Sequence, residues 1–211
     1  MGIRERKERE KIRKRETILR AAEKIFFKNG YEKTTMDEIA EKAEYSKGML
    51  YLYFRNKEAL YAAIMLRSID IFMKILNEEI SNAGGGRARL AAIKTAYLKF
   101  YLGHPDHMKV FLFASSYIMQ LQNENSDAII EEIMIKDKIF KGIICSAIEE
   151  AAKDGTLKEL GVSGDVESIY RAGGLVLNGI YKNIIDLEKM FETYDVDPKA
   201  AVDLAYGLLR F

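Results

Sequence analysis

The chain has 211 residues, of which 48% are hydrophobic and 31% charged, a balance typical of a folded globular protein. Its single cysteine excludes an internal disulfide, and only two prolines with no strong period-two pattern favour an all-α fold. Residues 1–62 carry 16 Lys and Arg against 11 Asp and Glu, whereas residues 63–211 carry 17 against 21. A basic first part joined to an acidic remainder fits nucleic-acid binding by the first part only.

A first helix is expected from about Glu8 to Lys28, with Ile18, Ala22 and Phe26 on its buried face. Gly30 follows as a helix stop, because glycine accepts the left-handed cap conformation. The charged run RERKEREKIRKRE at the start of the chain leaves two interpretations open. It is either a solvated extension of the first helix or a basic arm that reaches DNA phosphates or the minor groove.

Residues 34–60 indicate two short helices joined by a tight turn, followed by the start of a third helix. Thr35 can cap the first of them, and Glu38 three residues later completes a capping box. Ser46 can cap the second, whose spacing turns Leu50 and Phe54 inward. The polar, small and aromatic positions that remain available to an outside partner are Lys47, Gly48, Met49, Tyr51 and Tyr53.

The third of these helices begins with a cation in an unfavourable place. Asn56 can cap this helix, and Lys57 then lies in its first turn. A positive charge near a helix N-terminus costs about 0.3–1 kcal/mol. The misfit is easier to understand if Lys57 faces a phosphate, which the helix end would also attract.

The rest of the chain is expected to form further helices with polar or glycine-rich breaks. The helices are expected at Lys57–Ser81, Arg87–Leu102, Asp106–Leu121, a long helix ending near Asp154, Val166–Leu187 and a last helix from Pro198. The breaks are Gly84–Gly86, a polar linker at Gln122–Asp127 and a loop over 157–165. Gly84–Gly86 is interpreted as a flexible connection, because no strand precedes it and no Gly-Lys-Ser/Thr follows. We therefore expect an N-terminal three-helix domain at 1–62 and a C-terminal helical bundle at 63–211.

Residues 18–60 resemble the DNA-binding helix-turn-helix domain of the TetR family of bacterial transcriptional regulators. The resemblance lies in ILRAAEKIFFKNGYEKTTMDEIAEKA and SKGMLYLYFRNKEAL. It implies a homodimer whose recognition helices enter major grooves about 34–36 Å apart on a pseudo-palindromic double-stranded DNA operator. The DNA-binding residues implied are Thr34, Thr35, Ser46, Lys47, Gly48, Met49, Tyr51, Tyr53 and Lys57, with Thr35, Tyr51 and Lys57 on phosphates and Lys47, Gly48 and Met49 against base edges.

Three positions depart from the pattern of the family. Glu44 stands at a turn position where the family often has glycine, and a left-handed backbone there would cost a non-glycine residue about 1–2 kcal/mol. Tyr45 replaces a smaller aliphatic residue, and Met49 replaces threonine. The base contact at Met49 would be apolar, for instance to a thymine methyl group.

The resemblance also implies that the last two long helices pair with their copies from a second subunit as a four-helix bundle. Val166–Leu187 and Pro198–Leu209 fit this role, and the alternative is that they pack only within the subunit. The first of them contains Gly173, Gly174 and Gly179, each costing about 1 kcal/mol relative to alanine. We expect close helix approach to compensate for that cost.

The C-terminal bundle is expected to hold a small apolar or amphipathic effector. The resemblance implies a pocket between the helices at 93–102, 108–121 and 139–151, and aromatic and methionine side chains suit an adaptable apolar wall. Singly, each candidate can also be an ordinary core residue. The candidate ligand-binding residues are Tyr97, Phe100, Tyr101, Phe111, Tyr117 and Met119.

The sequence gives little support to an enzyme, a cofactor or a metal site. His104 and His107 lack a Glu-x-x-His pattern or cysteine partners, and no dinucleotide or nucleophile-elbow motif occurs. We expect no catalytic residue and a repressor released by its ligand, although an activator would look the same. The alternative is a helical ligand-binding protein or enzyme whose N-terminal helix pair does not bind DNA. A charged start and no apolar stretch long enough to span a bilayer predict a cytoplasmic protein without membrane contact.

Overall fold

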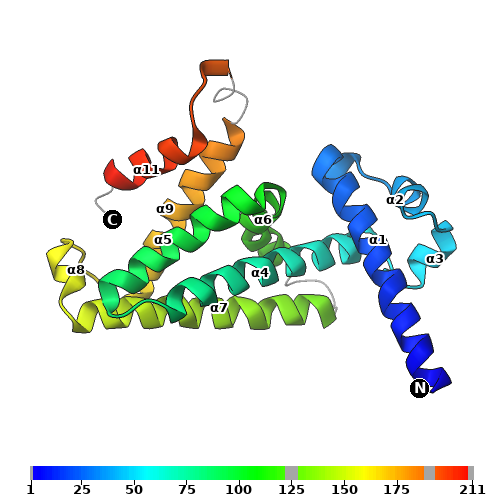
Figure 1. Ribbon diagram of the computed structural model, residues 1–211, viewed down its shortest axis with the longest axis horizontal. Coiled ribbons are helices and arrows are strands. Elements are labelled where there is room, and N and C mark those ends of the chain that lie inside the picture. Colours follow the sequence, from blue (N-terminus) through cyan, green and yellow to red (C-terminus); the bar gives the residue numbers. More distant parts are fainter. Residues whose placement is uncertain (1, 122–127, 188–192, 209–211) are drawn as a thin grey trace. The chain divides into compact units, whose positions relative to one another are not determined.

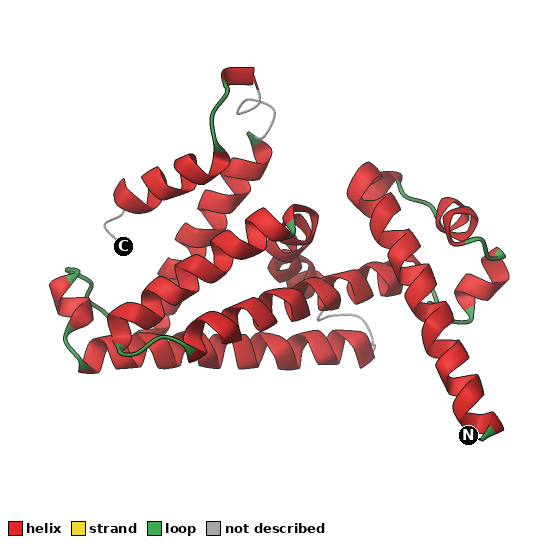
Figure 2. Ribbon diagram, in the orientation of Figure 1, coloured by secondary structure: helices red, strands yellow, loops and turns green. Residues whose placement is uncertain are grey.

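The computed structural model describes residues 2–121, 128–187 and 193–208, with the backbone alone for residues 3, 114–121 and 206–208. Every regular element in these ranges is a helix, which confirms the predicted all-α class (Figures 1 and 2). The helices are α1 (Ile3–Lys33), α2 (Met36–Ala43), α3 (Lys47–Tyr51), α4 (Lys57–Ser81), α5 (Gly86–Gly103), α6 (Pro105–Leu121), α7 (Ala128–Lys153), α8 (Thr156–Glu159), α9 (Val166–Asp186) and α11 (Pro198–Leu208). None of these described helices combines the length and apolar character that a membrane span requires.

The sequence placed most of these helices well, with three errors and one untested segment. The helix α1 begins at Ile3 rather than Glu8, so the charged run RERKEREKIRKRE is helical. It also ends at Lys33 rather than near Lys28, because Gly30 makes a kink inside the helix and does not stop it. A short helix, α8, replaces part of the loop predicted over 157–165. The predicted linker Gln122–Asp127 lies outside the described residues, as does Leu209.

The chain divides into two compact units, and the division falls inside α4 between Arg67 and Ser68. The first unit holds α1 to α3 and the first part of α4, with the start of α7 up to Glu132. The second unit holds the rest of α4 and α7 together with α5, α6, α8, α9 and α11. The domain boundary predicted between residues 62 and 63 stays a prediction.

A small apolar core holds the first unit together. Ile18 and Phe26 of α1, Ile39 of α2 and Leu50 of α3 are at most 3% exposed, and Phe54 after α3 is 2% exposed. The guanidinium of Arg15 lies 4.9 Å from the centroid of the Phe54 ring and covers it. Burying such side chains contributes about 1.5–3 kcal/mol each, so short helices that would be unstable alone are fixed by their neighbours.

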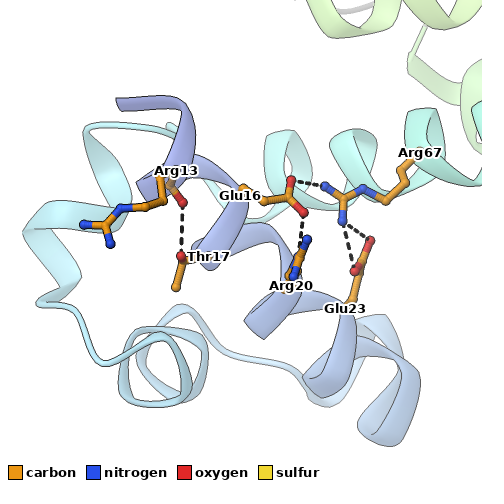
Figure 3. A network of polar contacts seen from close by, with 6 residues as sticks. All are labelled: Arg13, Glu16, Thr17, Arg20, Glu23 and Arg67. Atoms are coloured by element: carbon orange, nitrogen blue, oxygen red, sulfur yellow. Dashed lines mark hydrogen bonds and ion pairs between the residues drawn. The ribbon is translucent and has the colours of Figure 1, made fainter. Parts of the chain in front are cut away.

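A network of charged side chains links α1 with the first part of α4 (Figure 3). The Arg67 guanidinium donates to the carboxylates of Glu16 and Glu23, and Arg20 donates to Glu16 at 2.7 Å. Burial raises the pKa of Glu23 above its ordinary value, in spite of the Arg67 charge. Burial also raises the pKa of Glu16, but the hydrogen bonds from Arg20 and Arg67 outweigh it and the net pKa is lowered.

The second unit is built around a cluster of aromatic rings. The ring centroid of Phe72 on α4 lies 4.7 Å from those of Tyr97 on α5 and Phe111 on α6, and 5.7 Å from that of Phe140 on α7. Tyr181 on α9 is fully buried and stacks on Tyr97 at 5.7 Å. Rings at these distances attract one another in addition to their burial, and they connect five helices of this unit.

The start of α5 packs tightly against α7. Gly86 is buried, and an added Cβ there would lie 2.2 Å from the Cα of Ala151. The Gly86 N–H donates to Asp154 Oδ2 at 2.6 Å, while Gly85 has φ +79°. The glycines of this break were predicted to be a flexible connection, but Gly85 and Gly86 are required by backbone conformation and packing.

Candidate nucleic-acid interface and ligand cavity

Side-chain caps fix the two short helices of the first unit. Thr35 Oγ1 accepts from the N–H of Glu38 at 3.2 Å, and the Glu38 carboxylate accepts from the N–H of Thr35 at 2.8 Å. Ser46 Oγ accepts from the N–H of Met49 at 3.2 Å. The predicted capping box and the predicted Ser46 cap are therefore confirmed.

The turn between α2 and α3 contains a left-handed residue. Glu44 has φ 58° and ψ 37°, and its N–H donates to carbonyls of the last turn of α2. The sequence analysis expected a cost at Glu44 if its backbone were left-handed, and the structure has that left-handed backbone.

The helix α3 has a buried side and an accessible side. Leu50 is fully buried, and Lys47 and Gly48 are exposed. Tyr51 is 46% exposed, while Tyr53 is half-buried. The accessible side thus carries a cation, a glycine that permits close approach and a phenol, all of which can meet DNA. Their contact with DNA stays a prediction.

The cation of α3 has a partner within the same unit. Lys47 Nζ donates to Asp37 Oδ2 at 2.9 Å, and this hydrogen bond raises the pKa of Lys47. Both side chains are well exposed, so the ion pair is weak and can exchange with a phosphate or a base. The sequence analysis missed Asp37, because a pairing across ten residues and a turn has no periodic pattern.

The cation at the start of α4 is also engaged. Asn56 Oδ1 accepts from the N–H of Ala59 at 2.8 Å, which confirms the predicted cap. Lys57 Nζ donates to the Tyr31 carbonyl at 3.0 Å and lies 4.3 Å from the centroid of the Tyr31 ring. A carbonyl and an aromatic face compensate Lys57 for its unfavourable position, so a phosphate is not the only explanation for a cation there.

The prediction for Thr34 is wrong. Its side chain is 1% exposed, and its hydroxyl donates to the Gly30 carbonyl at 2.7 Å. Thr34 therefore closes the end of α1 and cannot present its hydroxyl to DNA. Thr35 and Ser46 are exposed, although both hydroxyls already serve helix caps.

The second unit contains a cavity of about 610 Å³ with a largely apolar wall. Tyr97 and Phe111 line it, as predicted, but Phe100 and Tyr101 do not. Phe100 is fully buried and Tyr101 is 6% exposed, so both are core residues. The side chains of the other two candidates, Tyr117 and Met119, lie outside the described residues.

Much of the cavity wall comes from helices that the sequence analysis did not assign to it. Phe72 on α4 and Tyr170 on α9 both line the cavity, although about a hundred residues separate them. Charged side chains line it as well, whereas few were expected. They are Arg87, Lys94, Asp137 and Arg171.

The glycines of α9 have open space around them within the described chain, so their predicted close approach to another helix stays a prediction for the subunit contact. A Cβ added at Gly173, Gly174 or Gly179 would meet no heavy atom within 4 Å, so no close helix approach within the described chain explains them. Gly173 and Gly174 line the cavity, as does Leu175, which is 77% exposed. Leu204 on α11 is 66% exposed.

The chain is similar to proteins of known class. Residues 18–64 match the family model of "Bacterial regulatory proteins, tetR family". The HTH-type transcriptional regulator QacR of Staphylococcus aureus is 30% identical over 79% of this chain and 83% of its own length. The HTH-type transcriptional activator FasR of Mycolicibacterium smegmatis is 31% identical, but over only 52% of this chain and 49% of its own length.

A solved structure supports the fold over most of the chain. The structure of AibR in complex with isovaleryl coenzyme A and operator DNA has a TM-score of 0.64 and 22% identity, covering 80% of this chain and 86% of that one. Two findings identify the family. Residues 18–64 match the family model, and QacR is 30% identical over most of both chains. The chain belongs to the TetR family of bacterial transcriptional regulators.

Proposed function

We propose that the chain acts as a homodimeric regulator that places α3 in the major groove of an operator. The observation that carries this proposal is the accessible side of α3, where Lys47, Gly48 and Tyr51 stand out while Leu50 anchors the helix. Two copies related by a twofold axis would read half-sites about 34–36 Å apart. Such a protein acts in the cytoplasm and needs no catalytic group.

The second copy would dock on α9 and α11. Leu175 and Leu204 expose apolar side chains on these two helices, and pairing of the last two long helices is what the family resemblance implies. An exposed leucine alone is ordinary, but two on the helices expected to form a four-helix bundle support this face.

An effector in the cavity would control DNA binding through α4. Lys57 near the start of this helix and Phe72 on the cavity wall belong to the same continuous helix. A ligand that favours one arrangement of the cavity wall would shift the population of dimers that fit the operator. If the effector releases the protein from its operator, the protein is a repressor. The alternative is an activator, which is what the relative FasR is named.

The test is selection of genomic DNA fragments with the purified protein, followed by affinity measurements on the selected operator at several salt concentrations. Tyr51→Phe and Lys47→Gln are expected to weaken binding. Only Lys47→Gln removes a positive charge, so only this variant is expected to lower the salt slope, by at most about 0.9. Tyr194→Phe and Lys138→Gln are matched controls, because both side chains are exposed outside the first unit. Unchanged affinity and slope in both Tyr51→Phe and Lys47→Gln would contradict the proposed interface.

A further inference from the structure

The net positive charge of the N-terminal part of the chain is concentrated at the start of α1. Residues 4–15 carry eight Lys and Arg against three Glu. Residues 16–62, which include the helix-turn-helix, carry eight basic and eight acidic side chains and have no net charge. DNA binding gains much of its affinity when Lys and Arg displace the counterions of phosphates. The start of α1 is therefore the largest source of that gain in this part of the chain.

The cations at the start of α1 lie on an exposed helix. The helix begins at Ile3, and every residue from 4 to 13 is exposed. Residues 3–14 span about 18 Å at a rise of about 1.5 Å per residue. Figure 1 shows these N-terminal turns of α1 extending beyond α2 and α3 of the same unit.

Three of these cations form a basic stripe, which consists of Arg4, Lys7 and Lys11. Spacings of three and four residues place them on one side of the helix. None of the three has an ion pair among the described residues. Like charges one turn apart destabilise a helix by about 0.2–0.5 kcal/mol per pair, so a polyanion along this side would relieve the repulsion.

The side of α1 that carries the basic stripe continues toward the end of α3. Lys14 and Arg15 are the next positions on this side. The Arg15 guanidinium lies 4.9 Å from the centroid of the Phe54 ring, just after α3. The hydrogen bond to Glu10 is the main cause of the raised pKa of Lys14, and Tyr53 adds to it electrostatically. The stripe thus extends a surface that begins beside the end of α3.

We propose that Arg4, Lys7 and Lys11 bind consecutive phosphates of the DNA backbone outside the base pairs that α3 contacts. The inference rests on the proposed function and adds a second contact surface to it. From Arg4 to Lys11 the helix rises about 10 Å. One DNA strand presents a phosphate about every 3.4 Å along the duplex axis, so each of the three side chains can reach a different phosphate.

The helical conformation decides which part of the DNA the basic stripe contacts. An α-helix with its side chains is about 10–12 Å wide, whereas the minor groove is about 6 Å wide. The stripe therefore binds the backbone and does not enter the minor groove, and backbone contacts carry no sequence information. A lipid surface fits less well, because Ile12 is the single apolar residue between positions 4 and 15.

The test measures the operator affinity of the full chain at several salt concentrations. Arg4→Gln, Lys7→Gln and Lys11→Gln, combined in one stripe variant, are expected to weaken binding at least tenfold. A dimer would lose three phosphate contacts from each copy, so the salt slope should fall by up to about 5. Affinity for a scrambled duplex should fall by the same factor, because phosphates do not report the sequence.

The opposite side of the same helix provides the matched control. It carries a second stripe with the same spacing, which consists of Arg6, Arg9 and Arg13. Replacing these three with Gln removes the same charge from equally exposed positions. Because they lie a helix diameter further from the phosphates and are screened, the control should keep its affinity within about threefold. Circular dichroism checks that both variants keep their helix content.

Three results would overturn the inference. Equal losses in the stripe variant and the control would show that total charge acts, and a loss on the operator alone would show that the stripe reads bases. Binding of phosphatidylglycerol vesicles that the stripe variant loses, with operator affinity unchanged, would assign the stripe to a membrane. A parent protein that selects no operator would refute the proposed function as well. A parent that selects one, with an unchanged salt slope in the stripe variant, would refute this inference alone.

Discussion

Glu44 is a residue whose backbone conformation is unfavourable for its side chain. It has φ 58° at the end of α2, where glycine would carry no Cβ penalty. The strain lies between two short helices that are otherwise well capped, so α2 and α3 keep their geometry in spite of it.

Replacing Glu44 with glycine is expected to stabilise the protein by about 1 kcal/mol, because the left-handed conformation no longer costs energy. Urea unfolding would measure the change. Glu44→Ala is the control, since it removes the same charge and keeps the Cβ. A gain in Glu44→Ala equal to that in Glu44→Gly would show that charge, rather than backbone strain, is responsible.

Glu16 and Glu23 contact the same guanidinium but have opposite pKa shifts. Burial dominates at Glu23 and raises its pKa, whereas the hydrogen bonds from Arg20 and Arg67 lower that of Glu16. The folded protein therefore holds the Glu23 proton to a higher pH than the unfolded chain does. The stabilising effect of this proton is complete below about pH 4.3, the ordinary pKa of glutamate, and is lost as pH rises through the raised pKa.

For Glu23→Gln, which stays neutral, we expect stability relative to the parent protein to improve as pH rises from about 4 to 7. Glu16 contributes stability above its ordinary pKa of about 4.3 and loses it as pH falls through the lowered pKa. Glu16→Gln should therefore become relatively less stable as pH rises from about 3 to 5, the window around and below that ordinary pKa. Urea unfolding of the three proteins at several pH values distinguishes the two slopes, and slopes of the same sign would refute this account.

At the scale of elements, the sequence predicted helix starts well where the capping residue lies within a few residues of the N–H group that it caps. Thr35, Ser46 and Asn56 cap the helices that they were predicted to cap. The start of α5 was different, because the role of Gly86 depends on Ala151, which lies far along the chain on α7. The sequence alone does not distinguish a run of glycines that is flexible from one that packs tightly against another helix.

Gly86→Ala is expected to destabilise the protein by about 1–3 kcal/mol or more, because the added methyl group overlaps the α7 backbone at Ala151. Gly84→Ala is the matched control in the same glycine run. A Cβ there meets no atom within 4 Å, and its φ is not positive. Thermal unfolding would compare the two, and equal melting temperatures would show that the close contact with α7 is absent in solution.

At the scale of the whole molecule, DNA recognition by the proposed mechanism needs two copies. Leu175→Glu and Leu204→Glu would bury charges in the proposed subunit contact without an opposite partner, which is costly. We expect these variants to sediment as monomers and to lose specific operator affinity. Leu102→Glu is the control, because Leu102 is 53% exposed on α5, outside the proposed contact. Dimers that persist in both Leu175→Glu and Leu204→Glu would place the subunit contact elsewhere.

The sequence by itself determined the all-α class, the helix-turn-helix and most helix ends, because caps, glycine stops and apolar spacing act within a few residues of one another. It also determined which side of α3 faces out, since burying Leu50 leaves Lys47 and Tyr51 exposed. Only the tertiary structure decided that Thr34 is buried and that Lys47 pairs with Asp37. Only the tertiary structure shows the cavity, whose wall comes from helices between α4 and α9. Packing brings these side chains together, and no periodic pattern in the sequence connects them.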